Sequence, residues 1–221
     1  SRIILLLLLI LLLILLLLIP IQMISGVISE RQNHREQVLR DIARSSSYKQ
    51  RIAGPVMVVP YHKKIREWKS QPDSNVRYQE ERLVEGALYF LPETFSLNGQ
   101  VRTEIRNRGI YEARLYHSDN KIGGSFSIPA MWGIREDIDD YAFDQPYLAI
   151  GISDIRGIES GLKLQFDGQA LNFKPGSLVK QLGDGIHATL PIGTSRQEAH
   201  VQFAFDLKLQ GTGELNVIPI G

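Results

Sequence analysis

The first apolar segment of the chain is long enough to cross a membrane. Residues 3–19 are all Leu or Ile, and no charge occurs from Ile3 to Ile24. As a helix, this segment spans roughly 33 Å, which matches the ~30 Å hydrocarbon core of a bilayer. A cleaved signal peptide, the alternative, has a shorter apolar core that precedes small residues. The pattern therefore predicts an uncleaved anchor that spans the lipid bilayer between Ile3 and Ile24.

The helix is expected to continue beyond the membrane. Val38, Leu39 and Ile42 recur at helical spacing, and neither Gly nor Pro interrupts residues 28–45. We therefore expect a membrane anchor over residues 1–26 followed by a juxtamembrane helix over residues 27–48.

From residue 49 the pattern changes to short apolar or alternating runs between turn residues, which is typical of strands. The predicted strands are 56–59, 82–91, 101–116, 125–128, 147–152, 162–166, 187–192, 201–209 and 215–220. So many strands with hardly any helix predict a mainly β fold. After the transmembrane helix and its extension, residues 49–221 should form an antiparallel, sandwich or barrel-like domain.

Glycine-containing turn signals separate these runs. They are Asn98-Gly99, Gly123-Gly124, Asp167-Gly168 and Gly183-Asp184-Gly185. The clearest is Asp167-Gly168, because alternating runs flank it at hairpin spacing. It predicts a two-residue type I′ turn, which requires positive φ at both centre positions.

Charge and composition exclude some classes of function. The chain has 25 basic and 24 acidic residues, so no global field favours nucleic acid, and we expect no nucleic-acid partner. It has no cysteine, which rules out disulfides and thiolate zinc sites within this sequence. More arginines follow the apolar segment than precede it, and this count alone would place the domain in the cytoplasm. Large domains, however, cross largely regardless of charge.

Residues 62–83 read as a charged hairpin. Folding at Pro72-Asp73 would bring Lys64 near Glu81, so the sequence predicts cross-strand salt pairing. A basic patch that touches lipid head groups beside Trp68 is the alternative.

An acidic cluster raises the question of a calcium site. Its members are Glu136, Asp137, Asp139, Asp140 and Asp144. The EF-hand pattern requires Gly at position six and Glu at position twelve. Counted from Asp137, these places hold Ala142 and Leu148. The cluster therefore favours a solvated acidic loop or helix start, with an irregular cation site as the alternative.

No pattern of catalytic or cofactor-binding residues stands out. The five histidines, His34, His62, His117, His187 and His200, show no metal-ligand spacing. The run from Gly151 to Ile155 lacks the second glycine of a nucleophile elbow. We predict a protein that is not an enzyme and holds no cofactor or metal.

Several segments together resemble the CreD family of bacterial inner-membrane proteins, also described as cell envelope integrity proteins, over nearly the whole chain. They are Ile28-Ser29-Glu30-Arg31-Gln32, Gly54-Pro55 with Val58-Val59-Pro60, Leu91-Pro92-Glu93, Arg108-Gly109-Ile110-Tyr111, Ser153-Asp154-Ile155-Arg156-Gly157-Ile158, Phe166-Asp167-Gly168-Gln169 and Pro219-Ile220-Gly221. The order and spacing of these segments carry the resemblance.

The resemblance implies a cytoplasmic N-terminus, a β domain on the periplasmic side of the inner membrane, and a role in envelope integrity and the response to β-lactam-type stress. It also implies more outer domain and further membrane helices after residue 221. Expected partners are an unknown envelope protein or a cell-wall component, and the oligomeric state stays open. Two rival hypotheses remain. One is an envelope-acting enzyme that uses carboxylates such as Glu93 or Asp154, and the other is a subunit or sensor of a larger membrane complex.

Overall fold

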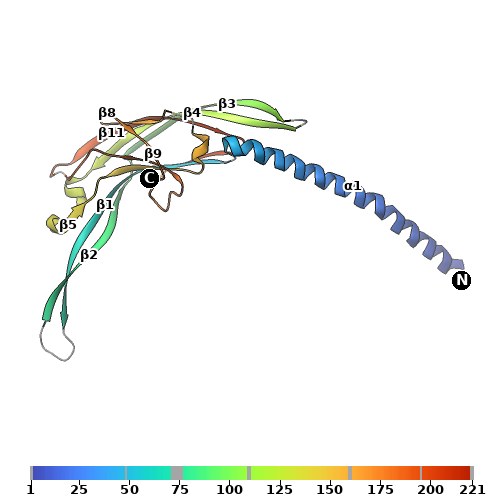
Figure 1. Cartoon of the computed structure of the whole chain (residues 1–221), viewed down its shortest axis with the longest axis horizontal. Coiled ribbons are helices and arrows are strands. Elements are labelled where there is room, and N and C mark those ends of the chain that lie inside the picture. The colour runs from blue at the N-terminus through green and yellow to red at the C-terminus, as the bar shows by residue number, and fades with distance from the viewer. Residues whose placement is uncertain are drawn as a thin grey trace.

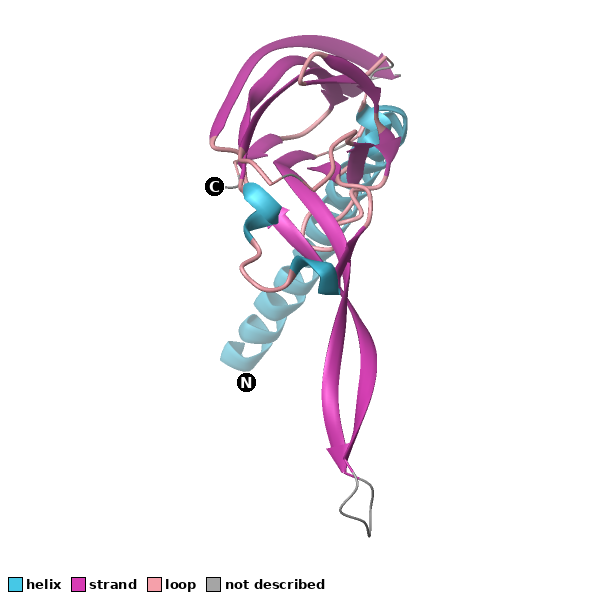
Figure 2. Cartoon of the chain, turned by 90° about the vertical axis from the view of Figure 1, so that its left-hand side faces the viewer, coloured by secondary structure: helices cyan, strands magenta, loops and turns pink. Residues whose placement is uncertain are grey.

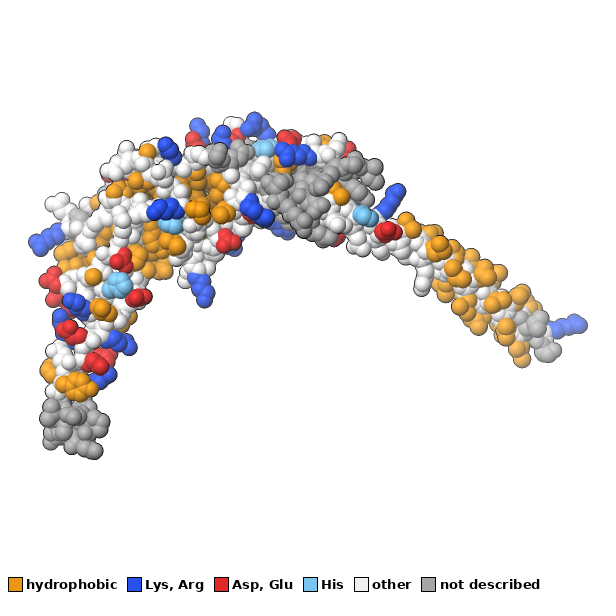
Figure 3. Space-filling view, viewed as in Figure 1, with side chains coloured by type: hydrophobic (Ala, Val, Ile, Leu, Met, Phe, Trp, Pro, Cys, Tyr) orange, Lys and Arg blue, Asp and Glu red, His pale blue; other side chains and the backbone are white. Residues whose placement is uncertain are grey.

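The computed structural model describes residues 2–47, 49–70, 77–108, 111–158, 161–194 and 196–219. One long helix, α1 (Arg2–Ser46), projects from a β domain (Figure 1). Large apolar side chains described between Ile3 and Ile28 are 49–75% exposed, and they cover the far end of the helix (Figure 3). Within the described residues, α1 is the one helix long and apolar enough to cross a membrane. The predicted apolar helix and its continuation beyond residue 28 are both confirmed, while the division into a membrane anchor over residues 1–26 and a juxtamembrane helix over residues 27–48 stays a prediction.

The β domain consists of two sheets. The seven-stranded sheet has the order β12-β1-β6-β10-β9, and β2 and β5 also pair with β1. Its strands are β1 (Gln50–Ser70), β2 (Arg77–Phe90), β5 (Tyr141–Phe143), β6 (Tyr147–Ile152), β9 (Lys174–Pro175), β10 (Gly185–Thr189) and β12 (Leu215–Ile218).

The five-stranded sheet has the order β3-β4-β11-β7-β8. Its strands are β3 (Thr94–Arg108), β4 (Tyr111–Ile128), β7 (Lys163–Phe166), β8 (Gln169–Asn172) and β11 (Ala199–Gly211). Three short 3₁₀ helices complete the described elements: η1 (Ala130–Gly133), η2 (Ile138–Asp140) and η3 (Ile155–Gly157). Strand pairs in the described chain are antiparallel except β1 with β12, which is parallel.

The main core lies between the two sheets, as a sandwich requires. Strand β11 alternates buried and exposed residues along most of its length, so one face packs inward and the other meets solvent. Strand β6 is different, because Leu148–Ile152 is buried on both faces. Its outer face packs in a second cluster with Val179 and Leu182. The predicted mainly β, antiparallel sandwich is therefore confirmed.

Two predicted turns and one predicted strand are wrong. Residues 101–116 do not form one strand, because β3 ends at Arg108, β4 begins at Tyr111, and the two pair antiparallel in an unbroken register from Thr94↔Ser125 to Arg108↔Tyr111. Asn98-Gly99 lies inside β3, and Gly123-Gly124 lies inside β4. Here glycine allows close approach: a Cβ on Gly99 would lie 2.6 Å from Asn120 Oδ1.

The Asp167-Gly168 turn is confirmed. It joins β7 to β8, and φ is 46° at Asp167 and 81° at Gly168, the two positive values that a type I′ turn requires. Gly183 closes another predicted turn, since its N–H bonds the Lys180 carbonyl before β10 begins.

The distal half of β1 and most of β2 form an arm that projects from the sandwich (Figures 1 and 2). The two strands remain paired out to Ser70↔Arg77. The predicted reversal at Pro72-Asp73 lies outside the described residues.

Candidate functional site

The helix joins the β domain through a short junction that contains two buried polar residues, Ser47 and Gln50. Ser47 follows the last residue of α1 in a left-handed conformation, with φ 77°, and it is fully buried. Its carbonyl accepts hydrogen bonds from the Thr212 N–H, at 3.0 Å, and from the Thr212 hydroxyl, at 3.3 Å. The helix end is therefore attached to the segment that links β11 to β12.

Gln50, the first residue of β1, is the centre of this junction. It is 1% exposed, and its side-chain amide donates to the Asp154 carbonyl at 2.7 Å. Its N–H bonds the Glu214 carbonyl at 2.7 Å. A buried amide with these partners holds the start of β1 to two segments more than a hundred residues further along the chain.

Ser153 supports the same strand start from the side. Its hydroxyl accepts from the Arg51 N–H at 2.9 Å and donates to the Lys49 carbonyl at 3.0 Å. In addition, the Ser153 N–H bonds the Arg51 carbonyl at 3.1 Å. Because the Ser153 hydroxyl is used in backbone contacts, it plays a positioning role, and the nucleophile elbow rejected from the sequence finds no support here.

Asp154 orders the turn that contacts Gln50. Its carboxylate caps η3 by accepting from the Arg156 N–H at 3.0 Å, and it accepts two bonds from the Arg156 guanidinium, at 2.9 and 2.7 Å. The Arg156 guanidinium holds the pKa of Asp154 below its usual value. Asp154 thus stays ionised at neutral pH and fixes the turn, which is unlike the behaviour of a general acid.

Gly157 completes the junction because no side chain fits at its position. A Cβ there would lie 2.2 Å from the Gln50 side-chain nitrogen and 2.7 Å from the Gln210 carbonyl. The segment from Ser153 to Ile158, one of those that carry the family resemblance, therefore packs against the base of the helix. Sequence reasoning missed Gln50, because it stands between Lys49 and Arg51 and nothing in the sequence distinguishes it from an exposed polar residue.

The projecting arm carries the predicted salt pairing, with different partners. Lys64 lies opposite Leu83, while Arg66 lies opposite Glu81 and contacts it at 3.1 Å. Lys69 pairs with Glu80. The prediction of cross-strand pairs is confirmed, but the Lys64–Glu81 pair is wrong because the partner of Lys64 lies two residues further along β2.

The acidic cluster lies beside the base of the arm. Glu136 bonds Lys63, Asp140 contacts Arg66 at 3.0 Å, and Asp144 contacts His62 at 3.2 Å. The predicted helix start is confirmed, since Asp137 caps η2. Among the described residues, no group of three or more His, Asp or Glu side chains is arranged to hold a metal ion. The ion pairs brace the arm against the sandwich.

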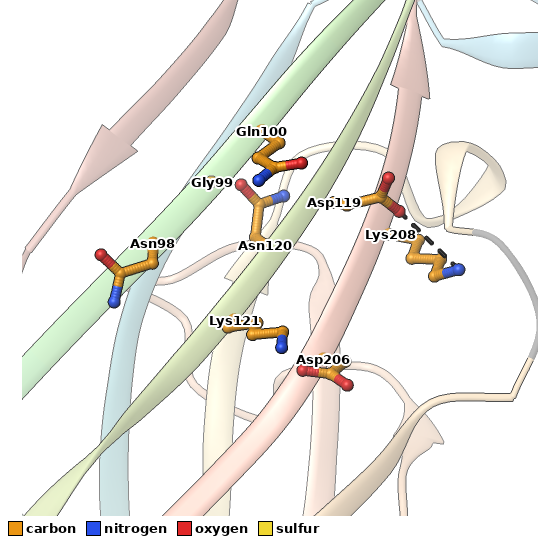
Figure 4. Close-up of a pocket in the computed structure, with 8 residues that line it drawn as sticks. All are labelled: Asn98, Gly99, Gln100, Asp119, Asn120, Lys121, Asp206 and Lys208. Carbon is orange, nitrogen blue, oxygen red and sulfur yellow. Dashed lines mark ion pairs between the residues drawn. The ribbon is translucent and has the colours of Figure 1, made fainter.

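A polar hollow lies over β3, β4 and β11 (Figure 4). It is lined by Asn98, Gly99, Gln100, Asp119, Asn120, Lys121, Asp206 and Lys208. The Asp119 carboxylate lies 2.9 Å from the Arg102 guanidinium and 3.7 Å from the Lys208 ammonium, so two cations balance its charge. We interpret this hollow as a hydrogen-bonding surface of the sheet.

The two carboxylates of the enzyme hypothesis lie in different places. Glu93 precedes β3 and is 3.5 Å from His200, whereas Asp154 belongs to the junction. Fold and junction together define a membrane-anchored β-sandwich protein.

The chain belongs to the CreD family of inner membrane proteins. It matches the family described as "Inner membrane protein CreD" over residues 2–221. It is 31% identical over 203 residues to the Inner membrane protein CreD of Escherichia coli (strain K12). The aligned region covers 92% of this chain and 43% of that relative. The chain thus spans less than half the length of this relative. No solved structure was found to match this chain. The family and the apolar helix support a location in the inner membrane.

Proposed function

We propose that this protein is a non-enzymatic brace that holds a β domain in a fixed orientation on the periplasmic side of the inner membrane. In this role it supports envelope integrity and the response to β-lactam-type stress by binding an envelope protein or a cell-wall component. The observation that carries the proposal is the buried junction around Gln50.

The junction favours a bracing role because it connects the chain after the helix to two other segments of the domain, the β11–β12 link and the η3 turn. Ser47 bonds the β11–β12 link, Gln50 bonds the η3 turn, and the Gln50 N–H bonds the residue before β12. A flexible tether would need none of these contacts. These contacts give force or position at the membrane a path from the helix end to the sandwich.

Two further observations support a role without catalysis. The Asp154 carboxylate and the Ser153 hydroxyl are both engaged in holding the junction. Two members of the acidic cluster, Glu136 and Asp140, form ion pairs with the arm. These groups, which sequence analysis weighed as candidates for chemistry, have structural partners instead.

The orientation is tested by protease accessibility. Protease added to intact spheroplasts is expected to digest the β domain, while a cytoplasmic protein in the same cells stays whole. Digestion only after lysis would place the domain in the cytoplasm and reject the proposed orientation.

The bracing role is tested by uncoupling the helix from the domain. A short Gly-Ser linker inserted after Ser47 should leave membrane insertion intact but abolish resistance to β-lactam stress, because the orientation is no longer fixed. The matched control carries the same linker after Gly193, where the surface is open. Full resistance with the linker after Ser47 would show that the domain works as a freely tethered module.

A further inference from the structure

Within the part of the chain that the structure describes, β3 is an edge strand of the five-stranded sheet, and no strand pairs with its outer side. Within the described chain it pairs only with β4, in a ladder of fifteen residue pairs without a register shift or a proline. Natural proteins usually interrupt, cover or shorten such edges, because the unpaired N–H and C=O groups can bind another strand. This edge is long and regular, which makes it a suitable surface for strand pairing.

The outer half of β3 also exposes apolar side chains on the face that elsewhere packs into the core. Val101 and Ile105 are 58% and 60% exposed, and they share the face of Leu97, which packs against the core. The β3–β4 hairpin extends beyond the sandwich and overhangs the end of α1 (Figure 1). The apolar face therefore continues past the core at the open edge.

The sequence of β3 is complementary to itself in one antiparallel register. When Thr103 lies opposite the partner's Thr103, Arg102 faces the partner's Glu104. In the same register, Val101 faces the partner's Ile105. The two-fold symmetry repeats each of these pairs, which gives two ion pairs on one face and two apolar pairs on the other. Arg102 is 75% exposed in the single chain and can reach a partner.

Neighbouring registers lose this complementarity. Centring the pair on Arg102 places the two arginines opposite each other, and centring it on Glu104 places the two carboxylates opposite each other. Like charges directly opposite on adjacent strands destabilise a sheet. The charges therefore select the register that also joins the apolar side chains.

We propose that two copies of this protein pair through β3, antiparallel and centred on Thr103, to form one continuous sheet across two sandwiches. The shared membrane favours this contact, because anchoring confines both copies and raises their effective concentration.

Disulfide trapping in membranes tests the register. The chain has no cysteine of its own. Directly opposite Cα atoms in an antiparallel pair are about 4.5–5.5 Å apart, within the range for a disulfide. Thr103→Cys is therefore expected to give a cross-linked homodimer under mild oxidation. Val101→Cys is the matched control and should give none, because the two Val101 positions would lie roughly 13 Å apart along the strand.

Charge exchange tests the same contact while the cross-linking position, Thr103→Cys, stays unchanged. In the Thr103→Cys background, Arg102→Glu is expected to lower the dimer yield at least about fivefold, since it places like charges opposite each other twice. Adding Glu104→Arg should restore the yield, because the exchanged pair is again complementary. This restoration also shows that the single variant failed at the contact and not in folding.

Three outcomes would overturn the proposal. They are no dimer with Thr103→Cys, equal cross-linking with Val101→Cys, or a cross-linked product whose mass contains a different protein. The last of these would show that the β3 edge is covered by another chain.

Discussion

Replacing Gly157 with alanine is expected to destabilise the β domain by about 2 kcal/mol or more. The new Cβ would lie 2.7 Å from the Gln210 carbonyl, which is part of β11 and cannot move freely, and 2.2 Å from the Gln50 side-chain nitrogen. If Gln50 moves away, its buried amide loses the bond to the Asp154 carbonyl. The expected readout is a lower urea midpoint with an unchanged m-value, measured on the detergent-solubilised chain.

The control for this variant is Gly193→Ala, because no atom lies within 4 Å of a Cβ at that position. It should leave the urea midpoint within experimental error. Equal midpoints for Gly157→Ala and the parent protein would mean that the turn relaxes away from Gln50, and the junction would then not be rigid.

The sequence was sufficient to predict the fold class because its signals are local. A long uncharged apolar run requires a helix in lipid. The apolar run 147–152 matches β6 residue for residue, and the two-residue spacing around Asp167-Gly168 matches the β7–β8 hairpin. Each of these features depends on residues that are close together in the chain.

The junction could not be predicted in the same way, since its contacts are long-range. Gln50 bonds residue 154, and Ser47 bonds residue 212. No periodicity relates such positions. The segment from Ser153 to Ile158 was noticed through the family resemblance and as a candidate for chemistry, but its structural role became apparent only from what it touches.

The mistaken salt pair has a similar cause. The register of a hairpin depends on the loop that closes it, and a shift of the turn by one residue changes every cross-strand partner. Lys64 thus faces Leu83 instead of Glu81. Charge content alone predicted pairing across the arm, but it could not determine which residues pair.

Glycine pairs are the hardest signal to interpret, and Gly123-Gly124 provides a direct test. Neither residue has a positive φ, so neither is required by a turn. A Cβ on Gly124 would lie 2.0 Å from the Thr94 carbonyl and 2.9 Å from the Phe203 ring. On Gly123, the nearest atom would be the Phe203 carbonyl, at 3.3 Å. Close packing therefore restricts Gly124 far more than its neighbour.

We expect Gly124→Ala to destabilise the domain by about 2–3 kcal/mol, because β3 must move away from β4 at their first paired residues. Gly123→Ala should change the free energy of unfolding by less than about 1 kcal/mol, since the Phe203 carbonyl, the atom nearest the new Cβ, needs to shift only slightly. Urea unfolding of the two variants side by side measures the difference. If both substitutions had the same large effect, the pair would behave as a turn, and the continuous β3–β4 ladder that positions the open edge would be incorrect.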